Sequence, residues 1–157
     1  MLQADLRTVE RHAHTYLVTY VPQGMDAAIY WGSLDYKFEN TSPYPVKIEA
    51  TVADGDVHII LRGTEWKDYT VKLSYKVLEE IPYETKTRLV TDGSYKNGEV
   101  IVTPYTGYTI TTYKTTVDLL GNPIETTKIK TSFYSKRDKV VALVPQNDPT
   151  PKPTEAP

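Results

Sequence analysis

The sequence has no cysteine and only two phenylalanines in 157 residues. The missing cysteine excludes disulfide bonds, thiolate zinc sites and a cysteine nucleophile within this chain. Basic residues are not in excess, because the formal net charge is −2. A nucleic acid partner is therefore not expected, since no positive field would hold a phosphate backbone. No apolar run reaches the roughly 18–20 residues of a spanning helix, so we expect no membrane insertion by this chain.

Phosphate loops, dinucleotide fingerprints, nucleophile elbows and zinc-finger spacings are also missing, so the sequence predicts no cofactor. What the chain has instead is thirteen tyrosines, many threonines and eleven prolines. Tyrosine and threonine favour strands with one face in water, and proline avoids helix interiors and central strands. The composition predicts a mainly β protein with a thin core.

The first 64 residues are expected to hold a short helix and a small β domain. Leucine and valine recur at helical spacing in Met1–Val9, which predicts a short helix there. Apolar and polar residues then alternate in Val46–Val52 and in Val57–Leu61, around the turn residues Ala53–Asp56. This pattern predicts a β-hairpin with one buried face.

The region after Trp66 is expected to be an elongated antiparallel β module with little core. A strand such as Thr109–Lys114 has isoleucine as its only aliphatic residue, so main-chain pairing and cross-strand side-chain pairs must supply the stability. Residues 147–157 are rich in proline and threonine and are predicted to be a disordered tail or linker. The predicted strands are Tyr69–Ile81, Glu99–Pro104, Tyr108–Leu119, Ile124–Phe133 and Lys139–Val144.

Glu10–Tyr36 combines a His-x-His pair, a Tyr-Val-Pro-x-Gly turn and an aspartate two residues after the glycine. This combination resembles the VanW family of Gram-positive cell-wall-associated proteins, a family without a settled biochemical activity. The resemblance implies that residues 1–64 are the C-terminal part of a VanW-like domain. It also implies that a Gly-x-Cys-Gln motif, usual a short way upstream in that family, lies outside this chain.

Residues 65–146 resemble the G-five domain, an extracellular module of cell-wall-associated proteins. The resemblance rests on Glu80–Tyr83, on Gly107 and Gly121, and on Arg137–Val141. The sequence departs from the family pattern where proline replaces two expected glycines. The resemblance implies an elongated fold of two small sheets and suggests binding of N-acetylglucosamine polymers. The two replacing prolines are Pro104 and Pro145.

His12, His14 and Asp26 are the candidate catalytic residues. Histidines two residues apart on a strand share one face, so with Asp26 they could bind a metal or act as general base and orienting group. The alternative is structural, with both histidines hydrogen-bonded to buried backbone. The resemblance implies that any nucleophile lies upstream, so this chain by itself is expected to be inactive.

A second group of candidates consists of aromatic side chains that could stack on sugar rings. The alternative is that these rings form the apolar half of a thin sheet. The turn formed by Tyr20, Pro22, Gly24 and Asp26 also has two interpretations. It is either a structural turn or a loop that contacts a ligand. The candidates are Tyr20, Tyr30, Trp31, Tyr105, Tyr108 and Tyr113.

Taken together, these features predict a non-catalytic cell-envelope module that binds peptidoglycan or its N-acetylglucosamine glycans, or acts as a spacer on them. The expected location is extracellular, as a surface protein or lipoprotein of a Gram-positive cell wall, with the signal or anchor outside this chain. The alternative is a fragment of a cell-wall-modifying enzyme whose nucleophile lies upstream.

Overall fold

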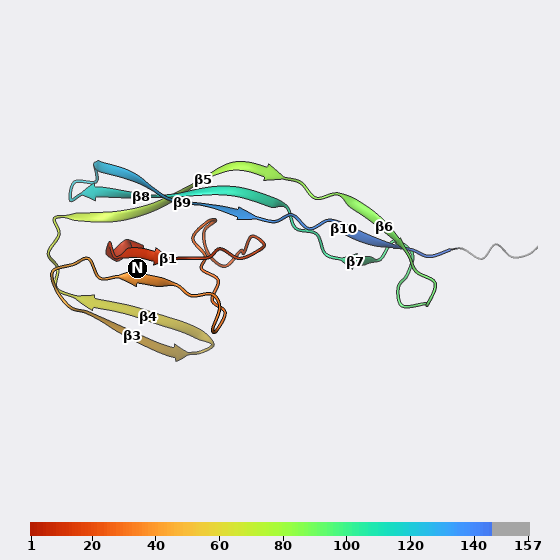
Figure 1. Cartoon of the computed structure of the whole chain (residues 1–157), viewed down its shortest axis with the longest axis horizontal. Helices are drawn as coiled ribbons and strands as arrows, with labels where there is room; N and C mark the ends of the chain where they lie inside the picture. Colours follow the sequence, from red (N-terminus) through yellow and green to blue (C-terminus); the bar gives the residue numbers. More distant parts are fainter. Residues whose placement is uncertain (146–157) are drawn as a thin grey trace, which may run out of the picture.

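The computed structural model of the chain describes residues 1–145 and shows an elongated arrangement of small sheets (Figure 1). The mainly β fold class predicted from composition is confirmed. The tail predicted for residues 147–157 lies outside the described residues. Within residues 1–145, no helix combines the length and the apolar character that crossing a bilayer would require.

Residues 69–143 form a long ribbon in which three passes of chain each contribute two strands. The first sheet has the order β5-β8-β9 and the second has the order β6-β10-β7. The five predicted strands agree with the structure to within two residues, whereas β6 was not predicted. The bounds are β5 (Tyr69–Ile81), β6 (Thr85–Leu89), β7 (Val100–Val102), β8 (Gly107–Asp118), β9 (Pro123–Tyr134) and β10 (Lys139–Leu143).

The central strand of the ribbon changes between its two sheets. In the first sheet the second pass is central, and β8 is antiparallel to both β5 and β9. The first and third passes therefore run in the same direction. In the second sheet the third pass is central, so β10 lies beside β6 in parallel. The prediction of a purely antiparallel module is wrong for this one pair, while β10 and β7 are antiparallel.

Gly107 permits the close approach of the second and third passes where the sheets meet. A Cβ atom at this position would lie 2.8 Å from the backbone nitrogen of Lys136 and 3.0 Å from the carbonyl oxygen of Tyr134. Those distances are shorter than a side chain tolerates, so glycine is required for the backbones to approach this closely. Beyond this point Tyr105 and Arg137 form a two-way backbone bridge.

The helix predicted over residues 1–9 is wrong. Within these nine residues the structure has a 3-10 turn, η1 (Leu2–Ala4), which Asp5 ends in a left-handed conformation with φ of 61°. It continues as β1 (Arg7–Glu10), which pairs with β2 (Lys37–Glu39). Two side chains of the ribbon bind the Asp5 carboxylate, and this tertiary contact overrides the helical spacing. The two side chains are Tyr69 and Lys114.

The predicted hairpin is confirmed as β3 (Val46–Ala53) and β4 (Asp56–Gly63), in continuous antiparallel register. Its predicted buried face is half-buried only at the base, at Val46 and Leu61. Toward the turn it is open, since Val52 is 75% and Val57 67% exposed. In Figure 1 the hairpin lies on the far side of the N-terminal segment (residues 1–45), away from the ribbon. The alternation predicts strands and their register correctly, but it does not reveal whether another element covers the apolar face.

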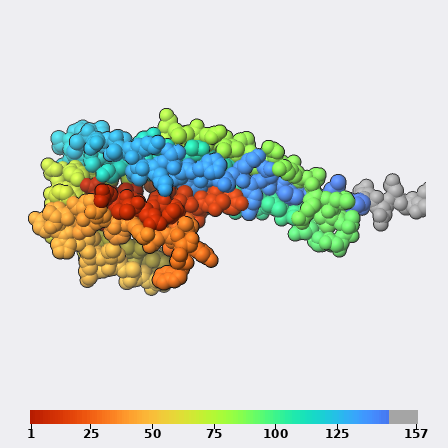
Figure 2. Space-filling view, viewed as in Figure 1, coloured from red at the N-terminus to blue at the C-terminus, as the bar shows by residue number. Residues whose placement is uncertain are grey.

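The small core lies between the N-terminal segment and the first sheet of the ribbon. Ile110 and Tyr134 are completely buried there. Polar side chains are also buried at this interface, so the packing depends on hydrogen bonds as well as on apolar contact. Figure 2 shows the molecule thickest where the N-terminal segment lies and tapering along the ribbon. The buried polar residues include Arg11, Asp26, Thr112 and Ser132.

Candidate functional site

Asp26 is a buried carboxylate at the centre of the interface between the N-terminal segment and the ribbon. The residue is 3% exposed. Its Oδ1 accepts hydrogen bonds from the Tyr134 hydroxyl and, at 3.2 Å, from Nη2 of Arg11. Its Oδ2 accepts hydrogen bonds from the backbone nitrogen of His14 at 2.7 Å and from Nδ1 of the same histidine at 2.8 Å. Four donors thus satisfy both oxygens, which is how a buried charge is tolerated.

Arg11 ties the turn that carries Asp26 to strand β9. Its guanidinium donates to the carbonyl oxygens of Asp26 and Gly24, at 2.5 and 2.6 Å, and to Oγ of Ser132 at 3.1 Å. Gly24 itself has φ of 77°, and its carbonyl also accepts a bond from Thr112. Planar donors in a fixed fork suit this multiple contact. The turn is therefore rigidly anchored to the ribbon.

The ionisation of Asp26 is determined by its contacts. Burial acts to raise the pKa of the carboxyl group, but hydrogen bonds from Tyr134 and His14, together with the charge of Arg11, outweigh it and hold the pKa below its usual value. Burial and the neighbouring carboxylate raise the pKa of Tyr134 to about 12. At neutral pH the pair is therefore a carboxylate and a neutral phenol that donates to it.

The His14 imidazole is held in one orientation by Asp26. Because a carboxylate only accepts hydrogen bonds, Nδ1 carries the proton in this contact and Nε2 is left as the basic nitrogen of the neutral ring. The side chain is 33% exposed, and Nε2 lies 3.3 Å from the hydroxyl of Tyr20. A carboxylate that fixes the tautomer of a partly exposed histidine gives it the form of a general base.

His12 does not join this group. Its Nε2 lies 3.0 Å from Oε1 of Glu10, and its carbonyl oxygen accepts a bond from the backbone nitrogen of Ala28. Among residues 1–145, no three histidine, cysteine or acidic side chains are placed to share a metal ion. Of the three candidate catalytic residues the structure thus joins two, His14 and Asp26, by hydrogen bonds.

The predicted aromatic candidates fall into two sets. Tyr20, Tyr30 and Trp31 belong to the N-terminal segment and are 71%, 70% and 97% exposed. The other three lie on the ribbon and form no single row. Tyr108 and Tyr113 are half-buried on opposite faces of β8.

The third ribbon tyrosine, Tyr105, is part of a stack. Its ring lies 4.8 Å from that of Tyr16, and the Arg137 guanidinium lies 4.3 Å from its centre. The stack joins the N-terminal segment to the point where the two sheets meet, which suits a structural role.

Sequence reasoning did not identify Arg11 and Tyr134. Arg11 bonds to Ser132 across 121 positions, and Tyr134 bonds to Asp26 across 108. Separations of this size leave no local pattern in one sequence. The nearest signal in the sequence is the His-x-His pair, which marks the region but does not point to Arg11 or Tyr134.

Residues 1–62 match the family model described as "VanW like protein". This match confirms the resemblance predicted from Glu10–Tyr36, and these residues are called the VanW-like segment below. The uncharacterized protein YoaR of Bacillus subtilis (strain 168) is 34% identical over 82 residues, which is 52% of this chain and 27% of that protein. The match thus spans about a quarter of that relative's length.

A solved structure titled "Crystal structure of HP0197-G5" is also similar, at 15% identity. The similarity covers 48% of this chain and 97% of that one, with a TM-score of 0.25. A TM-score this low does not establish a shared fold, and the architecture of the ribbon is defined by its own strands and register.

Proposed function

We propose that this chain is a non-catalytic module of the Gram-positive cell envelope that binds the glycan of peptidoglycan from outside the cell. The observation that carries the proposal is the placement of Trp31. Tyr30 and Leu34 pair with each other and close a tight turn. Trp31 follows Tyr30 in this turn with its side chain 97% exposed. A large aromatic ring held out in water has no packing role, and its flat apolar face suits the C–H face of a sugar ring.

Two further features support a binding role for the same segment. Tyr30 and Tyr20 add exposed rings, and the Arg11–Asp26 pair anchors the base of the segment to the ribbon. Such anchoring limits the conformational freedom that would be lost on binding. The long ribbon then acts as a spacer that carries the segment.

Sedimentation with insoluble peptidoglycan tests the proposal. We expect the chain to be retained in the pellet, and Trp31→Ala to lower retention several-fold because the exposed ring is lost. Leu120→Ala is the matched control, since Leu120 is 89% exposed on a distant turn of the ribbon and is not aromatic. The proposal fails if a known wall-binding protein sediments and this chain does not, or if the two variants behave alike.

The orientation of His14 favours a second candidate function, that of a part of a wall-modifying enzyme. Its Nε2 could take a proton from a nucleophile supplied by a longer VanW-like polypeptide. Such a polypeptide should modify wall fragments, and the activity should be lost in His14→Ala and retained in His58→Ala, a histidine exposed on β4. Equal activity of the two variants would remove this candidate.

A further inference from the structure

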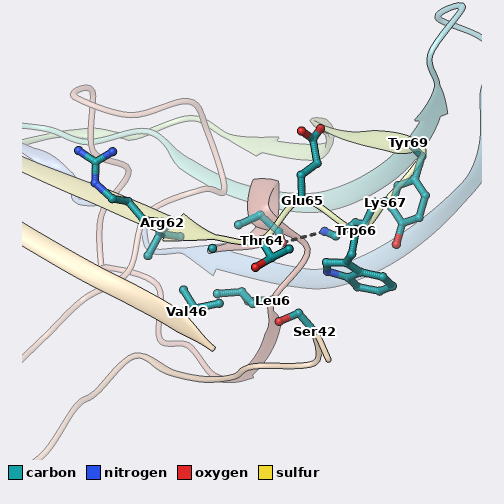
Figure 3. A pocket seen from close by; sticks show the side chains of 12 residues that line it. Leu6, Ser42, Val46, Arg62, Thr64, Glu65, Trp66, Lys67 and Tyr69 are labelled. Carbon is teal, nitrogen blue, oxygen red and sulfur yellow. Dashed lines mark hydrogen bonds between the residues drawn. The ribbon is translucent and has the colours of Figure 1, made fainter. Parts of the chain in front are cut away.

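A hollow of about 240 Å³ lies where the N-terminal turn, the base of the β3–β4 hairpin and the start of β5 meet. None of the predicted site residues line it. Figure 3 shows the side chains around it, which come from three separate parts of the chain. Its size is below the roughly 300–1,000 Å³ of sites for drug-sized ligands, so it has room for one ring or one side chain.

The floor of the hollow is apolar and one wall is aromatic. Leu6 is 3% exposed, and Val46 and Leu61 lie beside it half-buried. The Trp66 indole, 44% exposed, forms the wall. The ammonium group of Lys67 lies 5.7 Å from the centre of this ring, a distance at which it helps to hold the indole in place.

Hydroxyl groups supply the polar part of the lining. In Figure 3 the hydroxyls of Thr64 and Ser42 lie beside the apolar floor, while the side chains of Glu65 and Arg62 extend away from it. The charge of Lys67 is already bound, because Nζ donates to the carbonyl oxygen of Ala4 at 2.9 Å and lies 3.5 Å from Asp5. The ammonium group beside the hollow is therefore already paired, which favours a neutral ligand over an anionic one.

We propose that this hollow binds one N-acylated pyranose unit of a glycan. The C–H face of the sugar would stack on Trp66, and its acyl methyl group would contact Leu6. Its hydroxyls would bond to Thr64 and donate to Oγ of Ser42, whose own proton is engaged by Asn40 or Tyr44. A neutral ligand with one apolar and one hydroxylated side matches each surface of the hollow. The inference rests on the proposed glycan-binding function and adds a second contact site to that of Trp31.

The two tryptophans of the chain allow each site to be observed separately. Trp31→Phe leaves Trp66 as the only indole, and Trp66→Phe leaves Trp31. We would titrate both full-length variants with soluble, peptide-free N-acetylglucosamine oligosaccharides and record tryptophan emission. We expect a saturable change in the Trp66 signal of the Trp31→Phe protein.

Two substitutions made in the Trp31→Phe protein test the lining. Thr64→Val removes a hydroxyl from an exposed position with little change of shape, and we expect it to weaken binding several-fold. Thr51→Val is the matched control, because Thr51 lies exposed on β3 outside the hollow and its loss of a hydroxyl should leave binding unchanged. Equal effects of the two would overturn the assignment.

The remaining outcomes separate this inference from the proposed function. If the emission of Trp66 does not change on titration but the chain still sediments with peptidoglycan, the hollow is not a sugar site and the proposed function stands. If the chain does not sediment and neither tryptophan changes its emission, both the sugar site and the proposed glycan-binding function are overturned. An equal response to glucose oligosaccharides of the same length overturns the acyl-group assignment, and a response only to sugar-free wall peptides overturns the sugar.

Discussion

Arg11 and Asp26 form an ion pair whose side chains are only 6% and 1% exposed. Either charge left alone in this position would be costly, because so little of each side chain is open to solvent. The pair also fixes His14 and the turn at Gly24, so the geometry of the candidate site depends on it.

The first prediction concerns this pair. Asp26→Ala should lower the free energy of unfolding by about 3–5 kcal/mol, since Arg11 would be left buried without its partner. Glu39→Ala is the control, because its ion pair with Arg7 is largely exposed and should contribute about 0–1 kcal/mol. Urea unfolding followed by fluorescence measures both. A loss below about 1 kcal/mol in Asp26→Ala would contradict the buried network.

The second prediction is the pH dependence of stability. The pKa of Asp26 is lowered by folding, so its contribution is complete above the unfolded value near about 4 and is lost as the pH falls. The pKa of Tyr134 is raised to about 12, so its contribution is complete below about 10 and is lost as the pH rises. These two groups therefore add no slope to the free energy of unfolding between about pH 5 and 9.

The variants Asp26→Asn and Tyr134→Phe separate the two ends of this profile. Asp26→Asn should make the acid decline shallower, and Tyr134→Phe should do the same for the alkaline decline. Neither decline should vanish, because Asp5 also has a lowered pKa and Tyr69 also has a raised one. Unfolding curves recorded across the pH range would contradict the assignment if each variant simply shifted the whole profile downward.

Sequence alone identified part of this residue-scale picture. The spacing of His14, Gly24 and Asp26 predicted that the turn would bring an acidic group to the histidines, and it does so for His14. It could not show that His12 bonds to Glu10 instead, because strand β1 ends at Glu10 and residues 11–14 do not continue it. The prediction that both histidines share one face assumed a strand that does not form.

At the scale of elements, the turn at Gly24 forms the contact by which the N-terminal segment packs on β8. Its backbone is left-handed, and an added Cβ would lie 2.7 Å from Oγ1 of Thr112 and 3.0 Å from Ile110. Both conditions favour glycine, the first by conformation and the second by space. The contact is therefore sensitive to a single methyl group.

The third prediction compares two glycines. Gly24→Ala should destabilise the chain by clearly more than Gly32→Ala, whose φ is also 77° but which has no atom within 4 Å of an added Cβ. The control isolates the conformational cost, about 1–2 kcal/mol, and the excess in Gly24→Ala reports the steric clash. Urea unfolding measures the difference. Equal losses would mean that the N-terminal segment does not pack on β8.

Strands were predictable from the sequence where apolar and polar residues alternate regularly. Tyr69–Ile81 and the β3–β4 hairpin follow from period-two patterns, which depend only on local sequence. The parallel pairing of β6 with β10 was not predictable, because it depends on which pass occupies the centre of the second sheet. The helix over residues 1–9 failed for a similar reason, since contacts of Asp5 with distant ribbon residues decide its conformation.

At the scale of the whole molecule, backbone pairing rather than a large core maintains the long axis. Two three-stranded sheets follow one another along the ribbon (Figure 1). The N-terminal segment packs against the first sheet and, through Tyr16, reaches the point where the two sheets meet. The few aliphatic side chains in strands such as β8 predicted this thinness from composition. The division at residues 64 and 65 remains a prediction, and Asp26 and Tyr134 are bonded across it.

Small-angle X-ray scattering of residues 1–145 tests this central claim most directly. A compact chain of this length would have a radius of gyration of about 15 Å. We predict a value well above that, with a distance distribution that peaks early and extends in a long tail. A radius near 15 Å with a symmetric distribution would contradict the elongated ribbon.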